Sequence, residues 1–173
     1  PNAGKSTFLA HVSAAEPKIA DYPFTTLYPN LGVISLGYEK LTLADIPGLI
    51  HGANNGIGLG TRFLGHIERC GVLLHLIDVT LEQIENSYKT VRDELIAYGA
   101  NLSDKIEIIV LNKCDAILPE ESEAKKEELM TLTHKSSDDI YTISSVSGAG
   151  VKDLITRIFQ VTNLVYNNDL DNL

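Results

Sequence analysis

The stretch PNAGKSTFLAHVS, residues 1–13, decides the fold, because Gly4-Lys5-Ser6 stands directly before a helix-compatible run. A Gly-Lys-Ser/Thr at the start of a helix is the second half of a phosphate-binding loop. In the full pattern G-x-x-x-x-G-K-[ST], the first glycine would fall two residues before Pro1. We therefore expect this sequence to be a segment of a longer protein, in which another strand feeds the loop from the middle of the sheet.

Each residue of this loop has a physical role toward a bound phosphate. Ala3, Gly4, Lys5 and Ser6 would turn backbone N–H groups toward the α- and β-phosphates, and Gly4 lets the backbone approach without a Cβ. The Lys5 ammonium would neutralise the β- and γ-oxygens. The Ser6 hydroxyl would bind Mg²⁺, and Thr7 would add a second hydroxyl in the first helical turn.

The rest of the chain alternates short apolar runs with longer polar stretches, which is typical of an α/β fold: three layers, a mostly parallel sheet and helices on both faces. Strands are expected at Gly32–Leu36, Lys40–Ala44, Val72–Asp78, Ile106–Leu111 and Ile140–Ile143. Helices are expected at Lys5–Ser13, Thr61–Arg69, Leu81–Tyr98, Pro119–His134 and Val151–Val161. The tail 167–173 has lost the helical pattern, so the domain is expected to span 1–166.

A second motif follows the strand expected at Lys40–Ala44. Asp45-Ile46-Pro47-Gly48 places a carboxylate at a strand end and a glycine turn after it, where open α/β sheets bind ligands. Asp45 can orient the water shell of a metal ion, and the Gly48 N–H can meet a γ-phosphate. A lone D-x-x-G is more often an ordinary turn, so its position in the series is what gives it weight.

Two further motifs follow later strands. Asn112-Lys113-Cys114-Asp115 comes after IEIIVL, and Asp115 can accept hydrogen bonds from the ring N–H and the exocyclic amine of guanine. The turn Ser144–Val146, preceding Gly148 and Gly150, can offer backbone N–H groups to the guanine carbonyl. Chance agreement of four motifs in this order is improbable, so the sequence predicts a guanine-nucleotide site.

Composition excludes several other classes. The 173 residues are 44% hydrophobic and 21% charged, which fits a folded globular domain. With 14 basic and 23 acidic residues the net charge is −9, which speaks against generic DNA binding. No apolar run is long enough for a membrane span, and no signal peptide is visible. Cys70 and Cys114 form no disulfide framework, so we expect a cytoplasmic location.

Longer stretches between the motifs carry a family resemblance. They are ADYPFTTLYPNLGVI at 20–34, DIPGLIHGANNGIGLGTRFLGHIERC at 45–70 and HLIDV at 75–79. With PNAGKST, they resemble the Obg family of translation-factor-type P-loop GTPases over nearly the whole chain. The related DRG and YchF-type proteins share some of these elements, but Asp115 favours the guanine-binding branch. The resemblance implies the P-loop NTPase fold known as the G domain, with its first strand absent from this segment.

The resemblance also assigns the switch segments. It makes Tyr22–Thr26 switch I, with Thr26 as the second protein ligand of Mg²⁺ beside Ser6, and Asp45 as the third metal-site residue. The implied catalytic residues are Lys5, Thr26 and Gly48. Switch II would run from Asp45 through Gly60. The nucleotide-binding residues are then Asn2, Ala3, Gly4, Lys5, Ser6, Thr7, Phe24, Thr25, Thr26, Asp45, Pro47, Gly48, Asn112, Lys113, Asp115, Ser144, Ser145 and Val146.

Four positions bear on mechanism. Leu49 stands where Ras-like enzymes have a water-orienting Gln, so we expect slow hydrolysis. His51 replaces the Glu characteristic of the Obg family and is interpreted as a solvent-facing loop residue rather than a general base. Ser145 replaces the usual Ala, a small change if the contact is made by the backbone. Asn2 raises the hypothesis that K⁺ bridges the phosphates, against the alternative that it only shapes the loop.

The family resemblance implies GTP and GDP as ligands, with guanosine tetraphosphate as a candidate, and a role in bacterial large ribosomal subunit assembly and stress response. The domain is expected to be a monomer. An alternative is a nucleotide-gated binding module in which hydrolysis is only a slow reset.

His75 lies on an apolar strand and is interpreted as a core residue. Without the central strand, its neighbours should leave an open apolar slot and a segment of low stability.

Overall fold

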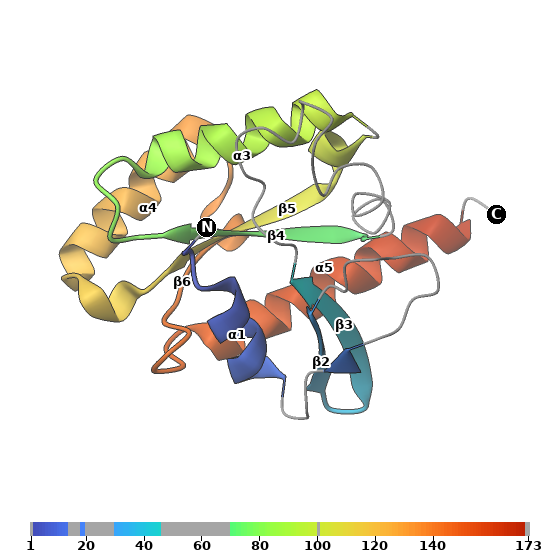
Figure 1. Ribbon diagram of the computed structural model, residues 1–173. Coiled ribbons are helices and arrows are strands. Elements are labelled where there is room, and N and C mark those ends of the chain that lie inside the picture. The colour runs from blue at the N-terminus through green and yellow to red at the C-terminus, as the bar shows by residue number, and fades with distance from the viewer. Residues whose placement is uncertain (1, 14–17, 20–29, 46–69, 100, 172–173) are drawn as a thin grey trace.

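A computed structural model of the chain describes residues 2–13, 18–19, 30–45, 70–99 and 101–171. These residues form two three-stranded sheets, one antiparallel and one parallel, with helices against them (Figure 1). None of the helices in these ranges is both long enough and apolar enough to cross a bilayer.

The parallel sheet consists of β4 (Val72–Asp78), β5 (Ile106–Asn112) and β6 (Ile140–Thr142), with β5 in the middle. Helices α3 (Ile84–Tyr98) and α4 (Pro119–Thr133) lie on one side of it, and α1 (Lys5–Val12) and α5 (Val151–Asp171) lie on the other (Figure 1). The sequence predicts these three strands to within one residue at each end. Apart from Glu107, β5 is apolar from Ile106 to Leu111, and all of its residues after Ile106 are buried.

Side chains of β5 alternate between two hydrophobic cores, as the two-residue period of a strand requires. Ile108 and Val110 pack with residues of α5 such as Leu154 and Phe159. Ile109 and Leu111 pack instead with side chains from α3, α4 and β4. All four of these side chains are fully buried. The core therefore holds β5 in place and fixes the position at which the loop after it begins.

The antiparallel sheet is formed by β1 (Lys18–Ile19), β2 (Asn30–Leu36) and β3 (Glu39–Asp45), with β2 in the middle. Strands β2 and β3 form a hairpin in which Leu36 pairs with Glu39, and Gly37 takes φ +61° in the turn. The predicted strands Gly32–Leu36 and Lys40–Ala44 are confirmed, with a few more residues at their ends. The short strand β1 was not expected.

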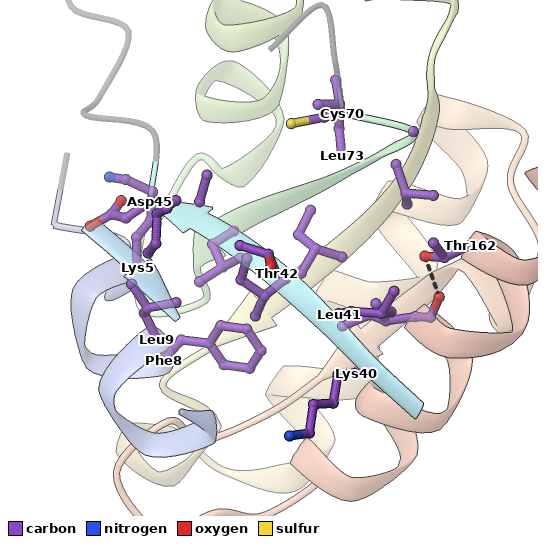
Figure 2. A pocket seen from close by; sticks show the side chains of 18 of the residues that line it. Lys5, Phe8, Leu9, Lys40, Leu41, Thr42, Asp45, Cys70, Leu73 and Thr162 are labelled. Atoms are coloured by element: carbon purple, nitrogen blue, oxygen red, sulfur yellow. Dashed lines mark hydrogen bonds between the residues drawn. The ribbon is translucent and has the colours of Figure 1, made fainter. Parts of the chain in front are cut away.

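A cavity of about 560 Å³ separates the two sheets, between β3 and β4 (Figure 2). Apolar side chains such as Phe8, Leu41 and Leu74 line much of it, and Lys5 and Asp45 lie together at one end. In the described ranges β3 pairs only with β2, and β4 pairs only with β5. The cavity therefore lies between the facing edges of the two sheets.

Two helices differ from their predicted bounds. Helix α3 begins at Ile84 rather than Leu81, because residues 78–81 form a turn closed by the Leu81 N–H bond to the Asp78 carbonyl at 3.3 Å. Helix α5 continues to Asp171 rather than ending at Val161. Val161 and Thr162 continue its buried face. The residues expected as a frayed tail are thus helical as far as Asp171.

The remaining expectations for regular structure have mixed outcomes. Helices α1 and α4 agree with their predicted ranges to within one residue at each end. The helix predicted at Thr61–Arg69 lies outside the described residues. Three short 3-10 helices were not expected: η2 (Leu102–Asp104), η3 (Cys114–Ala116) and η4 (Ser137–Asp139).

Candidate nucleotide-binding site

Helix α1 is preceded by a glycine whose conformation other residues rarely adopt. Gly4 has φ +86° and ψ +23°, and it precedes Lys5, the first helical residue. A Cβ on Gly4 would overlap the side-chain amide of Asn112. Asn2 also has positive φ, +60°. Left-handed residues just before a helix can turn backbone N–H groups toward one point, and the first N–H groups of a helix have no partner within it. This is the arrangement that binds anions.

Asn112 joins three predicted loops. Its amide nitrogen donates to the carbonyl of Ala3 at 2.8 Å. Its amide oxygen accepts from the N–H of Ser145 at 3.0 Å and from the hydroxyl of Ser145 at 2.8 Å. The side chain is buried, with only 1% of the residue exposed. The predicted phosphate loop, the N-K-x-D loop and the serine turn therefore meet at one residue.

Ser6 and Asp45, two predicted metal-site residues, come together although they are 39 positions apart. The Ser6 hydroxyl donates to a carboxylate oxygen of Asp45 at 2.8 Å. The other carboxylate oxygen, Oδ1, is buried and has no hydrogen-bond partner in the described part of the chain. A hydroxyl and an unsatisfied carboxylate oxygen are hard oxygen donors of the kind that Mg²⁺ prefers. The residues present thus fit the predicted ion.

The N-K-x-D loop leaves β5 and turns at once into η3. Lys113 has φ +71°, in the left-handed region, and the Cys114 N–H donates to the Ile143 carbonyl at 3.1 Å. This bond ties the loop to the end of β6. Asp115 lies in η3 and is exposed. Its carboxylate is therefore accessible to a ligand above the carboxyl edge of the parallel sheet.

The serine turn is fixed mainly by bonds within the protein. The Ser144 N–H donates to the Ala149 carbonyl at 3.0 Å, and the Ser144 hydroxyl accepts from Ser147 N–H at 3.0 Å. Val146 is exposed at the tip. The backbone contact of Ser145 with guanine stays a prediction, and the Ser145 hydroxyl makes a separate bond within the protein by donating to the Asn112 amide oxygen. An alanine at this position lacks that hydroxyl.

Several predicted site residues fall in ranges that the structure does not describe. They are Phe24, Thr25 and Thr26 of switch I, and Pro47, Gly48, Leu49 and His51 of switch II. Thr7 is exposed in the first turn of α1. Of the predicted residues that are described, those from the phosphate loop, Asp45, the N-K-x-D loop and the serine turn converge on the carboxyl ends of β3, β4, β5 and β6.

Asp78 is the residue of this region that sequence reasoning missed. It ends β4, and its carboxylate forms an ion pair with the Lys113 ammonium. Burial raises the pKa of Asp78, but hydrogen bonds from Lys113 and Thr80 more than offset this and hold the pKa below its usual value. The sequence holds a signal for this contact. In a parallel sheet, the last residue of one strand lies beside the loop that follows the neighbouring strand, so an acid that ends β4 is placed next to the N-K-x-D loop.

His75, earlier on the same strand, has the core role predicted for it. It is 8% exposed, its Nδ1 lies 3.0 Å from a carboxylate oxygen of Glu107, and its ring stacks on Tyr88. Burial raises the pKa of Glu107, but His75, Arg92 and Lys135 together hold it below its usual value. Burial and Glu107 raise the pKa of Tyr88 to about 12.

Solved structures of G domains share this architecture. The G domain of the FeoB iron transporter from T. maritima superposes with a TM-score of 0.66 at 18% identity, covering 94% of this chain and 93% of that one. Era from Aquifex aeolicus, bound to GDP and AlF4⁻, gives 0.68 at 23% identity, covering 93% of this chain and 54% of that one. A nucleolar GTP-binding protein 1 from Plasmodium falciparum gives 0.56 at 22% identity over 99% and 85%.

These similarities establish the P-loop GTPase fold predicted from the sequence. The family model described as 50S ribosome-binding GTPase matches residues 1–113, from the phosphate loop through Lys113. That range holds the phosphate loop, the D-x-x-G motif and the first two residues of N-K-x-D, and it covers well over half of the chain. The chain therefore belongs to the 50S ribosome-binding GTPase family.

Proposed function

We propose that this chain binds GTP and GDP with Mg²⁺ and hydrolyses GTP slowly, as the G domain of an Obg-type switch protein. The observation that carries the proposal is the set of bonds made by Asn112, which draw Ala3 and Ser145 to one point. A phosphate loop and a base-reading loop can serve one nucleotide only if they are held at a fixed distance. The buried Asn112 amide provides that connection.

Asp115 is the residue that reads the base in this proposal, with Asn112 holding the loop beneath it. An ionised carboxylate accepts from the ring N–H and the exocyclic amine of guanine, and adenine presents neither in that arrangement. Two charge-assisted hydrogen bonds of about 1.5–3 kcal/mol each correspond to roughly two to four decades of preference. The N–H groups of the serine turn would add a contact to the guanine carbonyl.

The phosphates would lie at the N-terminus of α1, against the Lys5 ammonium. Ser6, Asp45 and Thr26 would hold Mg²⁺, which neutralises charge on the β- and γ-phosphates when it is bound. The protein positions these groups while water attacks the γ-phosphate in line, so catalysis rests on orientation and electrostatics. Leu49 cannot hydrogen-bond to that water, and turnover should therefore be slow. We include K⁺ beside Asn2 as a candidate further ion.

Membership of a family described as 50S ribosome-binding GTPase supports a role at the large ribosomal subunit. The stretches 20–34 and 45–70 support the Obg assignment within that family. One structural neighbour, Era, has been solved with a segment of 16S ribosomal RNA, which is a property of that protein. We propose a cytoplasmic monomer acting in large-subunit assembly and stress response, with guanosine tetraphosphate as a candidate ligand.

The first test is nucleotide competition on the full-length protein. GTP, GDP and ATP would compete against a fluorescent guanine nucleotide in the presence of Mg²⁺. We expect guanine nucleotides to bind at least about a hundredfold more tightly than ATP, since two hydrogen bonds to Asp115 separate the bases. Equal competition by ATP would contradict the proposal that Asp115 reads the base.

A change of specificity gives a sharper version of the same test. Asp115→Asn replaces one acceptor with an amide donor, which suits the 2-carbonyl of xanthine better than the amine of guanine. We expect this variant to lose GDP affinity and gain affinity for xanthosine diphosphate. Asp104→Asn is the matched control, because Asp104 is an exposed aspartate in η2 with the same change of charge. A misfolded variant would lose affinity for GDP without gaining affinity for xanthosine diphosphate.

Leu49 favours a second candidate function, the nucleotide-gated binding module. In that case the nucleotide-dependent conformation is the output, and hydrolysis only resets it. Thr26→Ala separates the two functions. Loss of partner binding in the GTP state with little change in turnover would support the module, whereas parallel loss of both would support the enzyme.

A further inference from the structure

A tightly bonded turn joins β4 to α3 beside the base-reading loop. One carboxylate oxygen of Asp78 accepts from the Thr80 N–H at 3.0 Å and from the Thr80 hydroxyl at 2.7 Å. From α4, the Lys125 ammonium donates to the carbonyls of Val79 at 2.8 Å and Leu81 at 2.9 Å. The turn is thus fixed from inside by Asp78 and from outside by α4.

The second carboxylate oxygen of Asp78 is directed at the N-K-x-D loop. It accepts a hydrogen bond from the Lys113 ammonium, and the Asp78 side chain is only 13% exposed. Asp78 and Asn112 are also register partners at the ends of β4 and β5, and the Val79 N–H donates to the Asn112 carbonyl at 3.0 Å. Both the backbone and a side chain of the turn therefore hold the loop that contains Asp115.

The ion pair with Asp78 matters for Lys113, because both the backbone and the side chain of this residue are costly to hold in one conformation. Its backbone lies in the left-handed region at φ +71°, which is costly for a residue with a Cβ, and its side chain is 36% exposed. A lysine stem without a partner for its ammonium samples many rotamers. The ion pair with Asp78 fixes the ammonium end of this side chain, which restricts its rotamers and helps to hold the loop between Asn112 and Asp115 in one conformation.

We propose that Asp78 is a positioning residue for guanine-nucleotide binding, which acts by holding Lys113 and the loop between Asn112 and Asp115. This inference rests on the proposed function, since it assigns a part of the same site. Asp78 itself does not read the base. Its effect should therefore appear in the affinity for every purine that Asp115 accepts, and it should depend on the presence of Lys113.

A double-mutant cycle on the full-length protein tests this dependence. Asp78→Asn and Lys113→Met are each expected to weaken GDP binding about tenfold, the value of one charge-assisted hydrogen bond at the lower end of its range. The double variant should bind about as well as Lys113→Met alone. Asp78→Glu, which keeps the charge, should recover part of the affinity.

Two controls separate positioning from general damage. Glu121→Gln removes the exposed partner of Lys125, 3.3 Å away, and should leave GDP affinity unchanged. The ratio of GDP to inosine diphosphate affinity should stay the same in Asp78→Asn, because Asp115 still reads the exocyclic amine. Loss of stability alone would not make the effect of Asp78→Asn disappear in the Lys113→Met background.

The outcomes are distinguishable. Wild-type affinity in Asp78→Asn, or effects of Asp78→Asn and Lys113→Met that simply add, would overturn the inference and leave the proposed function intact. Failure of the wild-type protein to bind GDP would overturn the proposed function itself. A smaller loss in the double variant than the product of the two single losses would support the positioning role.

Discussion

Replacing Asn112 with alanine should destabilise the domain by about 3 kcal/mol. The substitution removes three hydrogen bonds of 2.8, 3.0 and 2.8 Å from a side chain that is 1% exposed. Each such bond contributes about 1 kcal/mol net. For a domain of this size, about 1 kcal/mol moves the unfolding midpoint by about 2–4 °C, so the variant should melt about 6–12 °C lower.

Two companion variants divide this effect between the partners of Asn112. Ser145→Ala removes only the hydroxyl bond and should cost about 1 kcal/mol. Asn112→Asp keeps an acceptor for Ser145 but loses the donor to the Ala3 carbonyl, and it places a negative charge against that oxygen. We therefore expect Asn112→Asp to lower GDP affinity as strongly as Asn112→Ala, although it retains the bonds to Ser145.

Urea unfolding monitored by far-ultraviolet circular dichroism would give the free energies, and fluorescent GDP titration the affinities. An unchanged slope with a lower midpoint would indicate lost stability rather than a different unfolded state. If Asn112→Ala costs no more than Ser145→Ala, the bonds of Asn112 to the Ala3 carbonyl and to the Ser145 N–H contribute nothing to folding. If Asn112→Asp also binds GDP normally, the three loops are not coupled through this residue, and the reasoning fails.

Three further predictions concern other parts of the molecule. Gly4→Ala should cost about 1–2 kcal/mol of stability for its left-handed backbone alone and should also weaken GDP binding, because the new Cβ overlaps Asn112; urea unfolding and nucleotide titration would show either effect. The Glu107 pKa is held below its usual value of 4.5, so its contribution is complete above that pH and is lost as the pH falls through the lower folded value. Glu107→Gln should therefore be less stable at pH 7 and lose less stability as the pH falls below 4.5 in urea titrations; an unchanged pH profile would contradict this. GTP turnover should be faster in potassium chloride than in sodium chloride, and equal rates would exclude a K⁺ ion beside Asn2.

The parallel sheet was predictable from the sequence because its strands have strong local signals. Residues 106–111 are apolar except for Glu107 and have a polar residue at each boundary, and such a run favours a buried strand. The order of the motifs along the chain then determines which strand ends they follow. Since parallel strands place their carboxyl ends at one edge, the sequence predicts that Asn112 and Ser144 lie at a common site.

The contacts that build the site were harder to predict, because they join residues far apart in the sequence. Asn112 and Ala3 are 109 positions apart, and Asp78 and Lys113 are 35 apart. Nothing in local propensity distinguishes an asparagine that binds a ligand from one that binds the protein itself. The extension of α5 to Asp171 was missed for a related reason: Thr162 is buried and bonds back to the Ile158 carbonyl, although its side chain is polar.

The acidic balance of the chain and its proposed phosphate site are compatible, because they act over different distances. A net charge of −9 lowers the potential around the whole domain, but salt screens this effect beyond about 10 Å. The α1 N-terminus and Lys5 act within hydrogen-bonding distance, through backbone dipoles fixed in place by Gly4 and Asn112. Affinity for a nucleotide therefore depends on how firmly these groups are held, and substitutions at Asn112 or Gly4 should affect it more than the removal of any exposed glutamate on α4.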